Sequence, residues 1–248
     1  MLLKVDNATK RFGGLVANDH LNIEIEKGSI VGLIGPNGAG KSTIFKSICG
    51  FNRIDEGNIF FNDQRITHKE TYKIARLGIA CTFQQAQLFA NITLEESVLM
   101  GAYCHQHSKK KALEIAREKI AFVGLAGHEN QQVSRLNMFE RKRAELAAAL
   151  ATQPELLLLD ELFAGLVPTE VEEMRLLVKR VNEELGVTLF IVEHVLRVIM
   201  SLCTKIYVLE YGKMIAAGTP NEITSNPEVI KAYLGEDYDG TSDRKSVV

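Results

Sequence analysis

The sequence predicts an α/β fold with a mostly parallel sheet, and three observations support this. Short runs of β-branched and aliphatic residues alternate with longer segments of helical period, as in strands joined by crossover helices. Several runs are apolar throughout, which is typical of strands buried on both faces. At 248 residues the chain is long enough to bury a core without disulfides or metals. The clearest predicted strands are Ser29–Ile34, Gly78–Phe83, Leu156–Asp160, Thr188–Val192 and Lys205–Leu209.

The N-terminal region predicts antiparallel strands instead. Apolar and polar residues alternate over Leu21–Glu26, and Lys27 and Gly28 follow as a turn. This alternation is expected of a strand with one solvated face. Asn58–Asn62 is predicted to be another such strand, so we expect an antiparallel β subdomain here.

Between Thr93 and Ala151 the strand pattern disappears. Thr93 and Glu96 have the spacing of a capping box, which marks the start of a helix. Lys109–Val123 and Met138–Ala151 are rich in residues of high helix propensity. We therefore expect an α-helical subdomain, about residues 88–151, inserted into the α/β core.

The C-terminal half predicts one further amphipathic helix and a polar end. Thr169–Leu185 has an apolar stripe, and Gly186 is placed to end the helix. Residues from Glu236 onward are polar. The expected organisation is one domain over 1–236 and a polar tail over 237–248.

Composition excludes several classes of protein. Lys and Arg total 29 against 31 Asp and Glu, and this balance argues against a nucleic-acid partner, which favours a basic excess. Charged residues follow the N-terminus too early for a signal peptide, and no apolar run reaches the ~18 residues of a membrane span. A membrane role is expected to come through a partner. Neither a zinc site nor a disulfide framework is predicted from the four separated cysteines, Cys49, Cys81, Cys104 and Cys203.

The strongest motif is a phosphate-binding loop between the strand Ser29–Ile34 and a helical segment. Its residues fit the pattern G-x-x-x-x-G-K-[ST] at every fixed position, which predicts a P-loop nucleoside triphosphatase core of the RecA-like type. Small residues let backbone amides converge on phosphate oxygens, and the following lysine adds positive charge. The predicted nucleotide contacts are Gly35, Pro36, Asn37, Gly38, Ala39, Gly40, Lys41, Ser42 and Thr43.

Two strand ends carry the other candidate catalytic groups. The buried strand Leu156–Asp160 ends in a carboxylate that is placed to hold Mg²⁺ through water, and Glu161 follows it to polarise an attacking water. The strand Thr188–Val192 is followed by His194, which is placed to reach the γ-phosphate. A structural role for this histidine remains open.

Together these residues resemble the ATP-binding-cassette family of ATPases over residues 2–236. The resemblance implies ATP and Mg²⁺ as cofactors, Phe12 as the aromatic that stacks on adenine, and Gln84 as a catalytic residue that senses Mg²⁺ and the transporter. It also implies that Ser42 and Asp160 bind the metal and that Glu161 and His194 are the catalytic carboxylate and switch histidine.

Within the family, five segments are most similar to branched-chain amino acid importers. A runner-up is the ATPase of lipopolysaccharide export, which the C-terminal Tyr-Leu-Gly-Glu-Asp also resembles. The implied partners are a second ATPase subunit, membrane permease subunits at the cytoplasmic face and, indirectly, a substrate-binding protein. The segments are Arg11–Ala17, Thr82–Gln84, Leu88–Phe89, Ile206–Leu209 and Ala232–Gly235.

The sequence departs from the family at surfaces offered to a second subunit. Leu136–Glu140 stands where the family has a Leu-Ser-Gly-Gly-Gln-like signature, so both glycines are missing. We expect Met138 and Phe139 to obstruct the phosphate of the partner's ATP, and Glu140 to repel it unless Arg141, Lys142 and Arg143 screen the charge. Leu162 replaces the usual proline, and Val167 replaces a residue that can hydrogen-bond.

These departures predict an asymmetric heterodimer, in which this chain binds ATP well but contributes poorly to its partner's site. Two rival functions remain open. One is a slow-hydrolysing nucleotide-binding regulatory module. The other is a cassette protein acting on ribosomes or in DNA repair, although such proteins usually carry two cassettes or long coiled-coil insertions.

Overall fold

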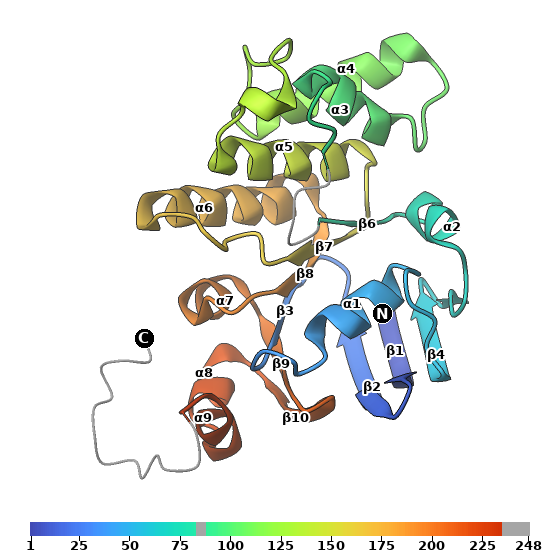
Figure 1. The fold of residues 1–248 in the computed structure, drawn as a ribbon, viewed down its shortest axis with the longest axis vertical. Coiled ribbons are helices and arrows are strands. Elements are labelled where there is room, and N and C mark those ends of the chain that lie inside the picture. The colour runs from blue at the N-terminus through green and yellow to red at the C-terminus, as the bar shows by residue number, and fades with distance from the viewer. Residues whose placement is uncertain (83–87, 235–248) are drawn as a thin grey trace. The chain divides into compact units, whose positions relative to one another are not determined.

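The computed structural model describes residues 1–82 and 88–234, and its α/β architecture confirms the predicted fold class (Figure 1). The chain divides into two compact units. The first contains Met1–Lys69 and Phe190–Val248, and the second contains Glu70–Leu189. Gln84 and the polar tail lie outside the described residues. The prediction of a single domain over 1–236 stays a prediction.

An antiparallel sheet forms the N-terminal part of the first unit, as predicted. Its order is β2-β1-β4-β5, and Leu3 lies opposite both Ile25 and Phe61. Leu21, Ile23 and Ile25 are fully buried, which explains the apolar alternation in the sequence. The strands are β1 (Leu3–Phe12), β2 (Leu15–Ile25), β4 (Glu56–Phe61) and β5 (Gln64–Arg65).

The first unit also holds a mixed group of strands that carries the phosphate loop. β3 (Ile30–Ile34) pairs in parallel with β9 (Lys205–Glu210), and β10 (Lys213–Gly218) pairs antiparallel with β9. Every residue of β3 is buried, as expected of a strand covered on both faces. The helices of this unit are α1 (Lys41–Ile48), α7 (Leu196–Leu202), α8 (Pro220–Thr224) and α9 (Pro227–Leu234).

One side chain connects these strands to the antiparallel sheet. The Tyr207 hydroxyl donates to the Glu24 carbonyl at 3.0 Å and accepts from the Glu24 amide at 2.9 Å. Both partners are backbone groups of β2, so the tyrosine hydroxyl satisfies the amide and the carbonyl of one residue of that strand. The two sheets of the first unit are therefore fixed against each other at this point.

In the second unit, two parallel strands bring the acidic strand end into place. β6 (Ile79–Cys81) pairs with β7 (Leu156–Asp160). The boundary between the two units falls within β8 (Thr188–Val192). α2 (Thr71–Arg76) precedes β6. The predicted apolar stripe of α6 (Pro168–Leu185) is buried, and Gly186 ends that helix in the left-handed conformation, with φ 68°.

The predicted helical region is confirmed as three mutually packed α-helices and a short 3-10 turn (Figure 1). Thr93 and Glu96 form the predicted capping box. A Cβ at Gly101 would lie 2.2 Å from the Ala148 carbonyl oxygen, so α3 and α5 approach at a point where a side chain does not fit. The elements are α3 (Leu94–Ala102), α4 (Lys109–Phe122), η1 (Val133–Arg135) and α5 (Met138–Ala151).

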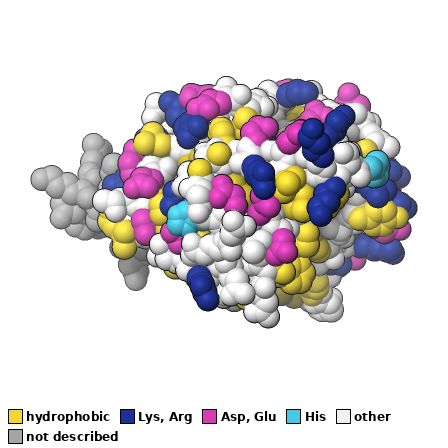
Figure 2. Space-filling view, turned by 90° about the horizontal axis from the view of Figure 1, so that it is seen from above, with side chains coloured by type: hydrophobic (Ala, Val, Ile, Leu, Met, Phe, Trp, Pro, Cys, Tyr) yellow, Lys and Arg dark blue, Asp and Glu magenta, His cyan; other side chains and the backbone are white. Residues whose placement is uncertain are grey.

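Charges of both signs cover the face seen in Figure 2. Basic and acidic side chains are interspersed there, with apolar side chains between them. This mixture agrees with the formal net charge of −2. Over residues 1–82 and 88–234, no helix combines the length and the apolar character that crossing a membrane requires.

Candidate functional site

The loop between β3 and α1 has the backbone that its glycines allow. Gly35, Gly38 and Gly40 have φ angles of 152°, 81° and 96°. A Cβ would lie 2.2 Å from the Leu209 carbonyl oxygen at the first of these positions, and 2.2 Å from the Ala17 carbonyl oxygen at the third. Glycine is therefore needed for both conformation and space.

Lys41 lies beneath this loop. Its side chain is buried, and its ammonium donates to the carbonyls of Gly35 at 2.6 Å and Pro36 at 2.9 Å. Because the N-cap of α1 is Gly40, the cap contributes no side-chain acceptor to the first helical amides. The helix N-terminus directs its amides at the loop, and the Lys41 ammonium lies beside it. This arrangement is suited to binding phosphate.

The back of the loop is held by two other segments of the first unit. The Asn18 amide donates to the Gly40 carbonyl at 3.0 Å. In the β9–β10 turn, the Gly212 amide donates to the Ala39 carbonyl at 3.1 Å, and the Gly212 carbonyl accepts from the Asp19 amide at 2.8 Å. The loop is thus hydrogen-bonded to β2 and to this turn.

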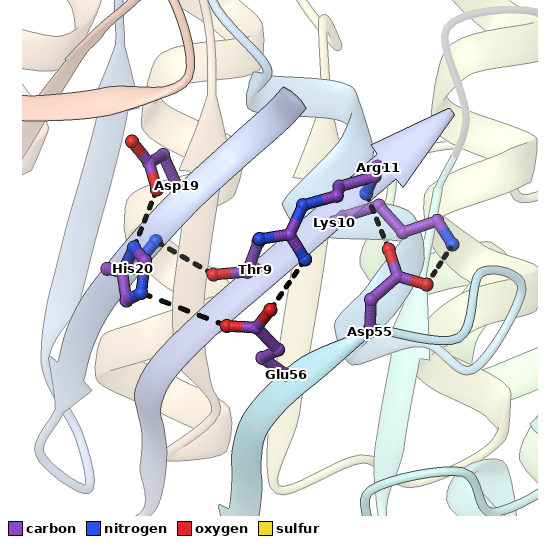
Figure 3. Close-up of polar contacts among 7 residues, drawn as sticks. All are labelled: Thr9, Lys10, Arg11, Asp19, His20, Asp55 and Glu56. Carbon is purple, nitrogen blue, oxygen red and sulfur yellow. Dashed lines mark hydrogen bonds and ion pairs between the residues drawn. The ribbon is translucent and has the colours of Figure 1, made fainter. Parts of the chain in front are cut away.

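Phe12 ends β1, and 49% of its surface is exposed. The Lys10 ammonium lies 5.1 Å from the centre of its ring. Asp55 accepts from the Arg11 amide at 2.5 Å and from Lys10 at 3.3 Å (Figure 3). The Arg11 amide, and then Lys10, hold the pKa of the Asp55 carboxyl below its ordinary value. The strand end that presents the aromatic ring is therefore anchored by an ionised carboxylate.

Comparisons with known proteins decide the family. A family model described as ABC transporter matches residues 18–164. The high-affinity branched-chain amino acid transport ATP-binding protein LivG of Escherichia coli (strain K12) is 37% identical over 250 residues, covering 95% of this chain and 98% of the relative. The chain belongs to the ATP-binding-cassette transporter family.

Further matches agree. BraF of Pseudomonas aeruginosa, another high-affinity branched-chain amino acid transport ATP-binding protein, is 36% identical, with 95% of this chain and 98% of the relative covered. A crystallised ATP-binding cassette of an ABC transporter in its ADP conformation superposes with a TM-score of 0.85 at 30% identity, covering 95% and 99% of the two chains. A model described as branched-chain amino acid ATP-binding cassette transporter matches 213–239.

The chain is thus an ATPase of the transport-coupled kind, and cassettes of this family work as dimers with membrane permease subunits. Its loop fits ATP, because its glycines permit the turn that lets backbone amides converge on phosphate oxygens, and the Lys41 ammonium adds positive charge. In the described part of the chain, no group of three or more His, Cys, Asp and Glu side chains is placed to hold a metal. Mg²⁺ prefers oxygen ligands, usually one or two protein carboxylates beside phosphate oxygens, and the Ser42 hydroxyl and the Asp160 carboxylate are of that kind. Their joint role as metal ligands stays a prediction.

In the second unit of the cassette, the acids at the end of β7 differ in exposure. Asp160 is buried, with 4% of its surface exposed, whereas Glu161 is partly exposed. Glu161 has φ 49°, a left-handed conformation that costs a non-glycine residue about 1–2 kcal/mol. Its carbonyl accepts from the Lys142 ammonium at 3.1 Å and the Ala164 amide at 3.2 Å. The turn that directs its carboxylate out of the strand is therefore held in place.

His194 lies in the first unit, two residues after β8. Its amide donates to the fully buried carboxylate of Glu193 at 3.3 Å, and its Nδ1 lies 4.0 Å from the same oxygen. Phe12, residues 35–43 and His194 thus belong to the first unit, and Asp160 and Glu161 to the second. Their meeting in one site stays a prediction.

The altered signature segment begins α5 with a complete capping box. The Asn137 side chain accepts from the Glu140 amide at 2.8 Å, and the Glu140 carboxylate accepts from the Asn137 amide at 2.8 Å. Met138 is 54% exposed, and its Cε lies 2.5 Å from the position a Cβ would take on Gly165. The helix end therefore carries a carboxylate and an exposed thioether side chain.

The expectation that Phe139 obstructs this end is wrong. Its side chain is buried, and the Arg143 guanidinium lies 4.3 Å from the ring centre. The Arg141 guanidinium donates to the carbonyls of Leu136 at 2.9 Å and Ser134 at 2.8 Å. Screening of Glu140 by its charge stays a prediction.

The other departures differ in exposure. Leu162 is buried, with 2% of its surface exposed. Val167 is 53% exposed and is the N-cap of α6, where the Glu170 carboxylate accepts from its backbone amide at 3.1 Å. The side chain at this surface position is apolar, as the sequence predicts.

Sequence reasoning missed two side chains near the loop. Asn18 is one of them. Tyr233 of α9 is the other: burial raises the pKa of its hydroxyl to about 12, and the Gly35 backbone opposes that rise. Within the described residues its Oη makes no hydrogen bond of good geometry. The tyrosine hydroxyl therefore lies near the backbone at the start of the loop.

We predict that Gly40→Ala weakens ADP binding by at least about 30-fold, because the added Cβ meets backbone and alanine resists the left-handed conformation. Gly127→Ala is the matched control. Gly127 also has a positive φ, 91°, but a Cβ there has nothing within 4 Å. Calorimetric titration with Mg·ADP measures both. Wild-type affinity in the Gly40 variant would contradict the proposed role of the loop.

Proposed function

We propose that this chain is the nucleotide-binding subunit of an importer for branched-chain amino acids, acting with a permease at the cytoplasmic face of the membrane. The observation that carries the substrate class is the match of 213–239 to a model of branched-chain amino acid cassettes. That range contains β10, α8 and α9. The similarity to LivG along nearly the whole chain supports the same class.

In this proposal the loop grips the nucleotide. Backbone amides of residues 35–43 and the Lys41 ammonium bind the phosphates, and Phe12 stacks on adenine. Ser42 and Asp160 hold Mg²⁺, the latter through water. Bound Mg²⁺ supplies charge neutralisation on the β- and γ-phosphate oxygens. Lys41 already lies under the loop, so binding requires its ammonium to exchange carbonyl partners for phosphate oxygens.

Hydrolysis then needs a water in line with the γ-phosphate. The Glu161 carboxylate orients and polarises that water, and His194 contacts the γ-phosphate. Gln84 senses both the bound Mg²⁺ and the transporter. Movement that follows hydrolysis is transmitted to the permease by Leu88, Phe89 and Ile92. Of these, Phe89 is 63% exposed.

The two cassettes of the dimer are unequal in this proposal. At the start of α5 the Glu140 amide donates to the Asn137 side chain and the Asn137 amide donates to the Glu140 carboxylate. This carboxylate places a negative charge where the partner's γ-phosphate would approach. This chain's own loop is intact. We therefore propose a heterodimer with a second ATPase subunit that carries an intact signature, served indirectly by a substrate-binding protein.

Glu161→Gln tests the motor function. We predict that ATP binding is retained while hydrolysis by the purified transporter falls by about 100-fold or more, because the amide cannot act as a base. Glu210→Gln, a change in an acid at the end of β9, is the control and keeps wild-type turnover. Equal turnover in the Glu161 variant would contradict the motor and favour a slow-hydrolysing regulatory module.

Glu140→Gln tests the asymmetry. Glutamine keeps the capping box but removes the charge, so we predict that ATP-dependent self-association of the isolated chain becomes stronger. Glu170→Gln is the matched control, because Glu170 occupies the same capping position in α6. Light scattering in the presence of ATP measures the self-association of both variants, each made in the Glu161→Gln background so that ATP is not hydrolysed. Cooperative, transporter-level hydrolysis by the unmodified chain alone would contradict the heterodimer.

Affinity purification from gently solubilised membranes distinguishes the candidate partners. Recovery of a permease and a second ATPase supports the importer, as does leucine-dependent transport by the recovered complex in proteoliposomes. Recovery of lipopolysaccharide-export components supports the runner-up. Recovery of soluble partners alone would reject both.

A further inference from the structure

Asn18 is a buried amide on β2, with 1% of its surface exposed. Burying an amide without hydrogen bonds is costly. Its Nδ2 donates to the Gly40 carbonyl at 3.0 Å, while its Oδ1 is buried and has no hydrogen-bond partner among the residues described. An apolar side chain of similar volume would avoid the cost of that oxygen. The contact with Gly40 is therefore the one hydrogen bond that offsets burial of this side chain.

The Gly40 carbonyl is a point of convergence. It also accepts from the amides of Thr43 at 3.1 Å and Ile44 at 3.2 Å, as the N-cap carbonyl of α1. In a planar trans peptide, the following N–H points opposite to the carbonyl. Donors gathered on the Gly40 carbonyl therefore direct the Lys41 N–H to the other side.

The orientation of this peptide depends on ψ of Gly40 and φ of Lys41, and glycine permits a wider range of ψ than a residue that carries a Cβ. Gly40 has φ 96°, and a Cβ there would lie 2.5 Å from Asn18 Nδ2. The Asn18 side-chain amide thus lies directly behind the peptide whose rotation would turn the Lys41 N–H away from a ligand.

We infer that Asn18 is a positioning residue for phosphate binding: its amide fixes the Gly40–Lys41 peptide so that the Lys41 N–H faces the phosphate. This inference rests on the proposed role of the loop in ATP binding. The residue touches the loop and not the nucleotide, so it acts by holding a donor that is itself backbone.

Asn18→Leu tests the inference, with Mg·ADP as the probe. We expect ADP affinity to fall about 5- to 20-fold, because the variant loses one neutral hydrogen bond that holds the peptide in its binding conformation. We expect the melting temperature without nucleotide to stay at or above the wild-type value, because the buried Oδ1 is removed. Asn182→Leu is the matched control. It removes a 2.8 Å bond from a side-chain amide to the Val187 carbonyl in the second unit, so it lowers the melting temperature and leaves ADP affinity unchanged.

Asn18→Asp adds a readout that a merely structural role would not move. An ionised carboxylate cannot donate to the Gly40 carbonyl, whereas a protonated one can. We expect its ADP affinity, relative to wild type, to recover as pH falls from about 8 to about 5.

The outcomes separate cleanly. If the wild type binds no ADP, the proposed function fails. If the wild type binds and Asn18→Leu binds equally well, this inference is overturned. If Asn18→Leu loses both stability and affinity, the pH series decides: recovery of the Asn18→Asp variant at low pH supports the inference, and a flat ratio overturns it.

Discussion

The structure depends on one constraint, the fixed backbone of the loop between β3 and α1. Its conformation requires positive φ at three glycines, and two of them have backbone carbonyls where a side chain would stand. Hydrogen bonds from β2 and from the β9–β10 turn hold it from behind. The antiparallel sheet, which could look like an appendage, is thus part of the phosphate-binding apparatus, and the Tyr207 contact fixes it to the strands that carry the loop.

The same physics explains why two helix N-termini in this chain are suited to opposite tasks. α1 begins with glycine, so its cap offers no competing acceptor and its amides suit an anion. α5 begins with a capping box in which Asn137 and Glu140 each accept one backbone amide, and Glu140 adds a negative charge. The first N-terminus suits phosphate, whereas the second already holds a carboxylate. The contrast lies in the capping residues and not in the helices.

Much of this was predictable from sequence because it rests on local patterns. β7 and α5 have the predicted bounds, and the phosphate loop was recognisable from its glycines and lysine. β1 was missed because its apolar alternation lasts only from Leu3 to Asp6 and breaks at Asn7, where φ is 53° and the pairing register shifts. Phe139 was misjudged because it stands, like Met138, where the family has a glycine, although helical periodicity places the two side chains on different faces and only Met138 is exposed.

Asn18 escaped prediction for a related reason. Alternation counted back from Leu21 would turn it to solvent, but His20 has φ 52° and the register against β1 shifts there, so the side chain turns inward. The Asp19, His20 and Glu56 contacts surround this irregularity (Figure 3). Neither a bulge nor the burial of one amide has a signal in a single sequence.

Calorimetric titration of Mg·ADP into the wild-type chain and into Lys41→Ala measures the central claim most directly, with Lys46→Ala, a change in the exposed lysine near the end of α1, as control. The account predicts tight binding to the wild type and the control, and an affinity reduced by about 100-fold or more when the ammonium under the loop is removed. Equal affinity in all three proteins, or no binding to the wild type, would contradict it.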